Sequence, residues 1–360
     1  MDENNKLEFT SRIDLGLLQN QLAQVRSELQ KVIVGQEKMI DYLLVALLSN
    51  GHVLLEGVPG IAKTITVKLL SKALDIGFSR IQFTPDLMPS DVLGTSVFDL
   101  KKSEFEFKKG PIFSNLILID EINRAPAKTQ AALFEVMEER QITIDGLRFK
   151  MQPPFLVIAT QNPIEQEGTY RLPEAQLDRF LFKIVIDYPS LEDEIQIITR
   201  EHEAKAQDKT ATVSKVLSAE DLVRYQAVVK NILVEPQLIE YIAKITQNTR
   251  ENSFLYLGAS PRASLAMLNA AKGFAALAGR DFVTPEDIKQ AAYPVLGHRV
   301  ILAPEKEMEG IRSEQIIQQI IESVAIPRWE KYTYIQAFSS GCSALWDSIP
   351  SLSFGWGSLP

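Results

Sequence analysis

The sequence predicts an α/β protein: a P-loop type of fold in which a parallel β-sheet lies between two layers of helices, followed by a smaller all-helical domain. Four short apolar runs lie at 53–55, 115–121, 154–160 and 181–186, and the second and third of them end in polar residues. Runs that are apolar throughout are typical of parallel strands buried on both faces. A glycine-containing loop joins the first run to a helical pattern, and past residue 187 the strand pattern disappears. This order favours a three-layer α-β-α core and a separate helical region.

Composition limits the class of protein. The 360 residues are 46% hydrophobic and 23% charged, as in a globular protein with room for two domains. No apolar run approaches the roughly 18 residues of a membrane helix, so we expect no membrane insertion. The polar, acidic start (residues 1–5) is unlike a secretory signal, and we expect a cytoplasmic location. The single cysteine, Cys342, excludes an intrachain disulfide and a Cys-rich metal site.

Charge also bears on partners. The net charge of −8 makes general binding of nucleic acid unlikely, although a local basic channel stays open as an alternative. The three histidines, His52, His202 and His298, are isolated in the sequence. They support neither a histidine metal site nor a Ser-His triad.

The loop after the first apolar run has the pattern of a phosphate-binding loop. Its residues are Gly57, Val58, Pro59, Gly60, Ile61, Ala62, Lys63 and Thr64. Glycines let backbone N–H groups face a phosphate, and the following helix adds its positive dipole end. We expect Lys63 to reach the β and γ phosphates and the Thr64 hydroxyl to ligate Mg²⁺. The strict pattern has Gly at position 62, so Ala62 requires helix-like dihedrals; a plain Gly-Pro turn is the alternative.

Two carboxylates end the second apolar run. Asp120 and Glu121 would lie at the same edge of the sheet as the loop, where open α/β sheets bind ligands. Asp120 would hold Mg²⁺, and Glu121 would activate the attacking water. The alternative is that both residues cap the next helix.

The last two runs add an amide and a guanidinium. Asn162 follows the third run and could hydrogen-bond both the γ-phosphate and the water, although Asn before Pro also opens ordinary turns. Arg179 precedes the fourth run. It either pairs with Asp178 or reaches the phosphate site of a neighbouring subunit.

In this order the motifs resemble those of the MoxR family of AAA+ ATPases. The matching segments are 33–36, 57–64, 120–125, 159–163, 172–180 and 258–262, and the resemblance covers roughly residues 15–326. It implies that Lys63 and Thr64 are the Walker A pair. The other implied roles are Walker B for Asp120 and Glu121, sensor 1 for Asn162, arginine finger for Arg179, sensor 2 for Arg262, and adenine pocket for Val34, Gly35 and Gln36.

The resemblance also implies an activity. It implies binding of ATP and Mg²⁺, ATP hydrolysis, and a hexameric ring with ATP at each subunit interface. It further implies chaperone-like remodelling or activation of protein complexes, with a client such as a von Willebrand A-type domain protein. A nucleic-acid motor and a nucleotide-gated scaffold with little turnover are the alternatives. The acidic balance counts against the first, and the complete set of catalytic residues counts against the second.

The expected domains follow from these patterns. They are a nucleotide-binding core (1–187), a helix and linker (188–217), a helical lid (218–326) and an atypical tail (327–360) to which we assign no role. Within the core, alternating patterns near 97–108 and 141–151 predict two β-hairpins, which either decorate the core or engage a partner.

Helix starts recur in the predicted lid. Capping-box patterns begin at Ser218 and Thr284, and a Ser-Pro-Arg start places Arg262 in a first helical turn. A cation there opposes the helix dipole. It therefore favours a nearby anion, with an exposed ion pair as the alternative.

Overall fold

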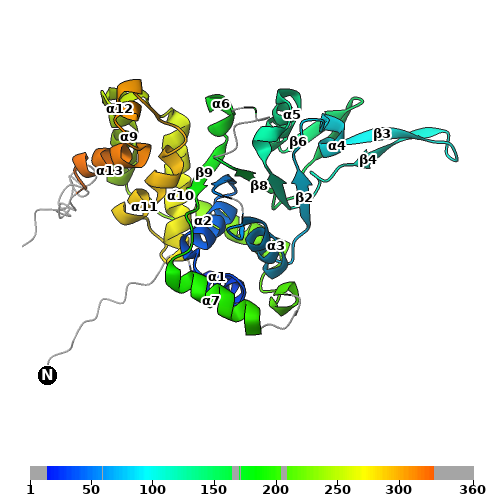
Figure 1. The fold of residues 1–360 in the computed structure, drawn as a ribbon, viewed down its shortest axis with the longest axis horizontal. Coiled ribbons are helices and arrows are strands. Elements are labelled where there is room, and N and C mark those ends of the chain that lie inside the picture. The colour runs from blue at the N-terminus through cyan, green and yellow to red at the C-terminus, as the bar shows by residue number, and fades with distance from the viewer. Residues whose placement is uncertain (1–13, 59, 164–169, 171, 204–208, 328–360) are drawn as a thin grey trace, which may run out of the picture. The chain divides into compact units, whose positions relative to one another are not determined.

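A computed structural model describes residues 14–327 except for residue 59, residues 164–169, residue 171 and residues 204–208 (Figure 1). Pro59 of the predicted phosphate loop and nearly all of the predicted tail therefore lie outside the described residues. The described residues up to Ala325 belong to one compact unit, so the domain boundaries near 187 and 218 stay predictions. Among the described residues, the helices lack the length and apolar character needed to cross a membrane.

The core is a parallel sheet of five strands in the order β2-β5-β8-β1-β9. The strands are β1 (His52–Glu56), β2 (Phe78–Gln82), β5 (Leu116–Asp120), β8 (Leu156–Gln161) and β9 (Phe180–Val185). Four of them coincide with the four predicted apolar runs. The fifth, β2, was not predicted because it is an edge strand with half-exposed and exposed residues rather than a continuous apolar run.

The sheet separates two hydrophobic cores because strand side chains alternate between its faces. Val53 and Leu55 enter one core, whereas Leu54 enters the other. The helices that contribute to the first core include α1 (Gly16–Gln30), α2 (Glu37–Leu48) and α3 (Lys63–Ala73), and those that contribute to the second are α4 (Pro89–Leu93) and α5 (Ala127–Glu139). This confirms the predicted three-layer arrangement.

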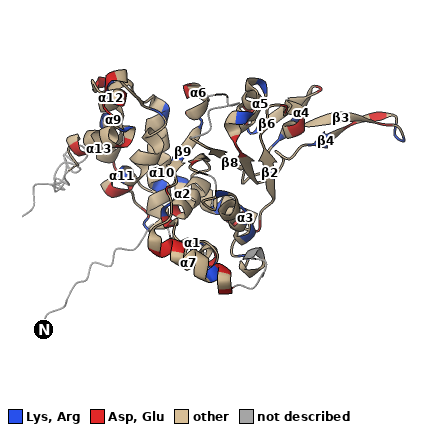
Figure 2. Cartoon of the chain, in the orientation of Figure 1, with Lys and Arg blue, Asp and Glu red and all other residues tan. Residues whose placement is uncertain are grey.

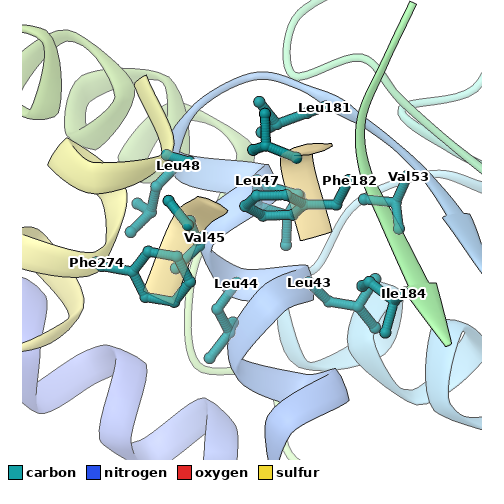
Figure 3. Close-up of a cluster of buried hydrophobic side chains, with 14 of the residues drawn as sticks. Leu43, Leu44, Val45, Leu47, Leu48, Val53, Leu181, Phe182, Ile184 and Phe274 are labelled. Carbon is teal, nitrogen blue, oxygen red and sulfur yellow. The ribbon is translucent and has the colours of Figure 1, made fainter. Parts of the chain in front are cut away.

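Helix α2 connects the sheet to the C-terminal helices. Eight of its residues are buried, and the helix packs against β9 on one side and α10 (Pro261–Leu277) on another (Figure 3). A Cβ atom added to Gly273 would lie 2.7 Å from Val45 Cγ1 and 2.8 Å from Ser49 Oγ, so a glycine is required for this close approach. The Ser49 hydroxyl also donates to the Asn269 carbonyl.

Both predicted hairpins form. They pair β3 (Gly94–Asp99) with β4 (Glu104–Lys109), and β6 (Gln141–Ile144) with β7 (Leu147–Lys150), in antiparallel register. Apolar side chains near their ends are exposed, among them Leu100 (85%) and Leu147 (63%).

The C-terminal part is helical. Its helices are α7 (Leu191–Glu203), α8 (Ala219–Lys230), α9 (Pro236–Glu251), α10, α11 (Pro285–Leu296), α12 (Pro304–Met308) and α13 (Ser313–Ser323), with a 3-10 turn at Lys209–Thr212. Helices α8 and α11 begin at the predicted Ser218 and Thr284 capping boxes. A short antiparallel pair, β10 (Leu255–Leu257) with β11 (Ile301–Leu302), adds a small sheet that the sequence did not predict.

Candidate active site

The predicted phosphate loop joins β1 to α3 through residues 57–62. A Cβ atom at Gly57 would lie 2.7 Å from Ile61 Cδ1 and 2.8 Å from the Ile186 carbonyl oxygen, so only glycine fits. At Gly60 the φ angle is +88° and a Cβ atom would meet nothing within 4 Å. The loop thus has a packed base and an open outer side, where backbone N–H groups can meet a phosphate.

Ala62 corrects one expectation. The sequence argument required helix-like dihedrals at this position, but Ala62 is left-handed, with φ 61° and ψ 14°, immediately before α3. This conformation costs an L-residue about 1–2 kcal/mol relative to the right-handed helix. Glycine adopts these left-handed angles without that cost, which accounts for its presence at this position of the strict loop pattern.

Lys63 and the two carboxylates meet in one cavity of about 410 Å³, which we call the phosphate cavity. It is lined by Lys63, Thr64, Arg80, Asp120, Glu121 and Asn162, together with neighbouring residues. The Lys63 ammonium donates to the Gly57 carbonyl at 2.5 Å. Burial lowers the pKa of Lys63, although the nearby carboxylates oppose this effect. The ammonium is thus held at the loop, in a site that disfavours uncompensated charge.

Asp120 is the last residue of β5 and is 7% exposed. Its carboxylate accepts hydrogen bonds from Arg80 Nε at 2.6 Å and from the Thr160 hydroxyl at 3.2 Å. Two partners from the flanking strands β2 and β8 therefore fix this buried carboxylate at the strand end.

Glu121 follows in a left-handed conformation (φ 58°), just before the 3-10 turn Ile122–Arg124. Its carboxylate accepts a hydrogen bond from Gln82 Nε2 at 2.8 Å and forms an ion pair with Arg124 at 3.1 Å. It does not act as a side-chain cap of that turn, which was the alternative interpretation.

Sequence reasoning did not place Thr160, at the end of the third apolar run, in the site, and it missed two further residues, Arg80 and Gln82. Both lie on the unpredicted strand β2, whose register pairs Gln82 with Asp120. The available signal was the alternation of Ile81 and Phe83, both buried, with Arg80 and Gln82, both exposed. That period of two is typical of an edge strand.

The predicted adenine residues lie at a second cavity of about 810 Å³. Gly35 and Gln36 line it together with Tyr42 and residues 183–190, whereas Val34 is buried and does not line it. Both Gly35 (φ 65°) and Gln36 (φ 57°) are left-handed, which turns the chain into α2. Tyr42 and Tyr188 offer aromatic contacts for a flat heteroaromatic ring, and charged side chains, among them Lys183 and Asp193, also line this cavity.

Arg179 and Arg262 are not in the phosphate cavity. Arg179 precedes β9 and donates to the Phe134 carbonyl at 2.7 Å, and both arginines lie 3.5 Å from the Glu138 carboxylate. Asp178, the alternative partner of Arg179, pairs with Arg299 instead.

These residues form what we call the arginine cluster: Arg140, Arg179, Arg262 and Arg299 with Glu138 and Asp178, around a cavity of about 270 Å³. The side chain of Arg262 is 56% exposed, and that of Arg179 is 29% exposed. Four cations with two carboxylates leave a surplus of positive charge at this place. Acidic residues lie on other elements of the molecule, among them α7 and α12 (Figure 2).

Comparisons with known proteins agree with this geometry. The family model for the ATPase family associated with various cellular activities (AAA) matches residues 52–182, and that for the AAA lid domain matches residues 247–320. Chaperone MoxR1 of Mycobacterium tuberculosis is 46% identical over 310 residues, covering 84% of this chain and 81% of the relative. Protein YeaC of Bacillus subtilis, an uncharacterized protein, is 45% identical over 306 residues, covering 85% and 95%.

Structural comparison leads to the same fold. A crystal structure of a protein from Cytophaga hutchinsonii matches with a TM-score of 0.80 and 45% identity, covering 86% of this chain and 96% of the other. The phosphate cavity lies within the segment that the AAA model matches, and Arg262 lies within the segment that the lid model matches.

Proposed function

Because this chain belongs to the MoxR family of AAA ATPases, we propose that it hydrolyses Mg²⁺-bound ATP and uses the energy to remodel or activate protein complexes. One observation supports the proposal: the candidate catalytic residues fall into two separate groups, the phosphate cavity and the arginine cluster. The first holds the lysine, the carboxylates and the amide. The second holds Arg179 and Arg262, to which we assign a role in hydrolysis.

The residues of the phosphate cavity suit ATP and Mg²⁺. The Lys63 ammonium would contact the β and γ phosphates, and the loop's N–H groups would surround them. Thr64 and Asp120 offer the oxygen ligands that Mg²⁺ prefers. When bound, Mg²⁺ supplies neutralisation of charge on the phosphates.

The remaining cavity residues act on the water. Glu121 would accept its proton or orient it, and Gln82 holds the carboxylate at the cavity wall. The Asn162 amide would hold the γ-phosphate and the water together. The adenine ring would lie at Gly35 and Gln36, next to α2.

The arginine cluster would complete the site of a neighbouring subunit. Arg262 is exposed and Arg179 is partly buried, and both lie outside the phosphate cavity of their own chain. A head-to-tail ring places the same two surfaces against each other at every interface. We therefore propose a ring, hexameric as in the family, in which Arg179 is the finger and Arg262 assists it.

The proposed biological role is chaperone-like. A relative that is 46% identical is named a chaperone, which supports this role. We propose a protein client, such as a von Willebrand A-type domain protein, rather than nucleic acid.

The test is ATP turnover per protomer as a function of protein concentration, with Mg²⁺ and without a client. A cooperative rise that coincides with ring assembly in sizing experiments is the expected result, because sites completed between subunits need assembly. Appreciable turnover by a species that sizes as a monomer would overturn the two-part site.

A further inference from the structure

Within the arginine cluster, Arg299 has the most extensive set of described side-chain hydrogen bonds. It lies shortly after α11, and its side chain is 3% exposed. Its guanidinium donates to the Asp178 carboxylate (2.6 Å) and to the carbonyls of Val295 (2.6 Å), Asp178 (2.9 Å), Phe180 (2.7 Å) and Leu181 (3.3 Å). Four of these five contacts go to residues 178–181. One buried side chain of the C-terminal region therefore fixes the backbone on both sides of Arg179.

A second contact reaches the same point from α10. The Ser260 hydroxyl, at the start of the helix that carries Arg262, donates to the Asp178 carboxylate at 3.2 Å. Asp178, the residue before Arg179, therefore accepts hydrogen bonds from two residues of the C-terminal region, Arg299 and Ser260. Next to it, the Nε2 atom of His298 donates to the Phe180 carbonyl at 3.0 Å.

The contacts of Arg299 are of the kind that fix position. A buried guanidinium needs a carboxylate and further acceptors, and removal of one partner from such a set is costly. Its planar fork also imposes directions that the flexible ammonium of lysine does not. By contrast, Arg179 itself has one short contact, to Phe134, and a 3.5 Å ion pair. The Arg179 side chain can therefore adjust, while the backbone from which it extends is fixed.

We propose that Arg299 is a positioning residue for the finger: it ties residues 178–181 to the C-terminal helices, so that a movement of these helices repositions Arg179. The inference rests on the proposed function of Arg179 at the neighbouring subunit. Its consequence is that the C-terminal helices of one subunit control hydrolysis in the phosphate cavity of the next.

The proposal predicts a defect that acts only between subunits. In Arg299→Gln the phosphate cavity stays intact, so ATP binding is retained. Turnover should fall about 10²-fold, as expected when a catalytic group is displaced by about 1 Å. Arg299→Lys keeps the charge and should recover part of the loss, and Asp178→Asn, which leaves no cavity, should reproduce part of it.

The experiment mixes two inactive proteins. Arg299→Gln supplies an intact phosphate cavity, and Glu121→Gln supplies an intact finger but cannot activate water. At equal amounts, about one interface in four of a randomly mixed ring combines both intact parts, so turnover should recover to at most roughly a quarter of wild type. The same mixture with Arg179→Ala in place of Arg299→Gln tests the finger itself.

The outcomes separate the two proposals. Recovery with both mixtures supports the positioning role. Recovery with Arg179→Ala but not with Arg299→Gln overturns the positioning role alone. No recovery with either means that Arg179 does not act between subunits, and both proposals fail.

A matched control comes from a second ion pair of the C-terminal helices. Arg280 donates to Asp287 at 2.8 and 2.6 Å, and neither residue contacts residues 178–181 through a described hydrogen bond. Arg280→Gln should lower thermal stability while turnover below the unfolding temperature stays near wild type. A turnover loss equal to that of Arg299→Gln would mean that general weakening of the helices explains the effect, and it would overturn the proposal.

Discussion

The phosphate cavity and the arginine cluster differ in their balance of positive and negative charge. In the cavity both carboxylates have partners on a neighbouring strand: Asp120 has Arg80 and Thr160, and Glu121 has Gln82. In the cluster, cations outnumber carboxylates, and Arg262 is more than half exposed. A site whose charges are matched can hold its geometry alone. A site with surplus positive charge suits an anion that another molecule brings.

The largest expected effect separates the two regions directly. If Arg179 acts as the proposed finger, Lys63→Ala and Arg179→Ala should both abolish turnover, the latter by about 10³–10⁵-fold, the contribution typical of arginine fingers. Only Lys63→Ala should also lose ATP binding, because only Lys63 lies in the phosphate cavity. Steady-state turnover and calorimetric ATP binding measure the two effects. If Arg179→Ala lost ATP binding as fully as Lys63→Ala, the division between the regions would not hold.

The two regions also differ in what the sequence predicts. Asp120 and Glu121 end one apolar run and Asn162 follows another, so the burial of parallel strands places the three residues at one edge of the sheet. Their presence in one cavity was therefore predictable. Arg80 and Gln82 were not predicted, because the edge strand that carries them lacks a continuous apolar run.

Arg299 shows a second limit. Its contact with Asp178 joins residues 121 positions apart, and no local pattern marks either residue as a partner of the other. The Ala62 expectation failed for a different reason: the loop's path, and not the preference of alanine, sets the backbone angles there. Local patterns thus predicted the strand-end chemistry, whereas contacts made by packing of the C-terminal helices needed the structure.

Lower pH should destabilise the fold through a buried histidine at the arginine cluster. His52 lines its cavity and is buried, and this burial lowers the pKa of His52 from 6.5 to about 3. Its Nδ1 accepts from the Val157 N–H, and its Nε2 donates to the Met137 carbonyl, so a second ring proton has no acceptor. Burial also lowers the pKa of His298, next to Arg299.

The sign of the pH effect follows. Below pH 6.5 the unfolded chain takes up a proton at His52 that the folded chain refuses until about pH 3. The free energy of unfolding should therefore fall as pH falls through this window, by about 1.4 kcal/mol per pH unit for each such histidine. Denaturant unfolding at pH 5 and pH 7 measures this change. His52→Gln should reduce the slope; a slope equal to that of the wild-type protein would contradict the assignment.

A smaller effect concerns the packing of α10, the helix that carries Arg262, against α2. Gly273→Ala on α10 places a methyl group 2.7 Å from the stiff Val45 side chain, and such overpacking costs about 1–3 kcal/mol of unfolding free energy. Because α10 carries Arg262, turnover should fall more than ATP affinity does. Gly16→Ala, where the nearest atom is an exposed Asp14 oxygen at 3.2 Å, is the matched control and should be close to neutral. A stability gain in Gly273→Ala would disprove the close approach of α10 to α2.

The smallest expected effect concerns Ala62, which lines the phosphate cavity. Ala62→Gly relieves the left-handed strain of about 1–2 kcal/mol. Glycine also raises the conformational entropy of the unfolded chain, which offsets about 0.4–1 kcal/mol of this gain. The net gain in unfolding free energy should be about 1 kcal/mol or less, with ATP affinity and turnover near wild type, since the loop path is unchanged. Denaturant unfolding beside ATP titration measures both. A loss of stability would mean that Ala62 is not strained, and it would restore the helix-like geometry that the sequence argument required.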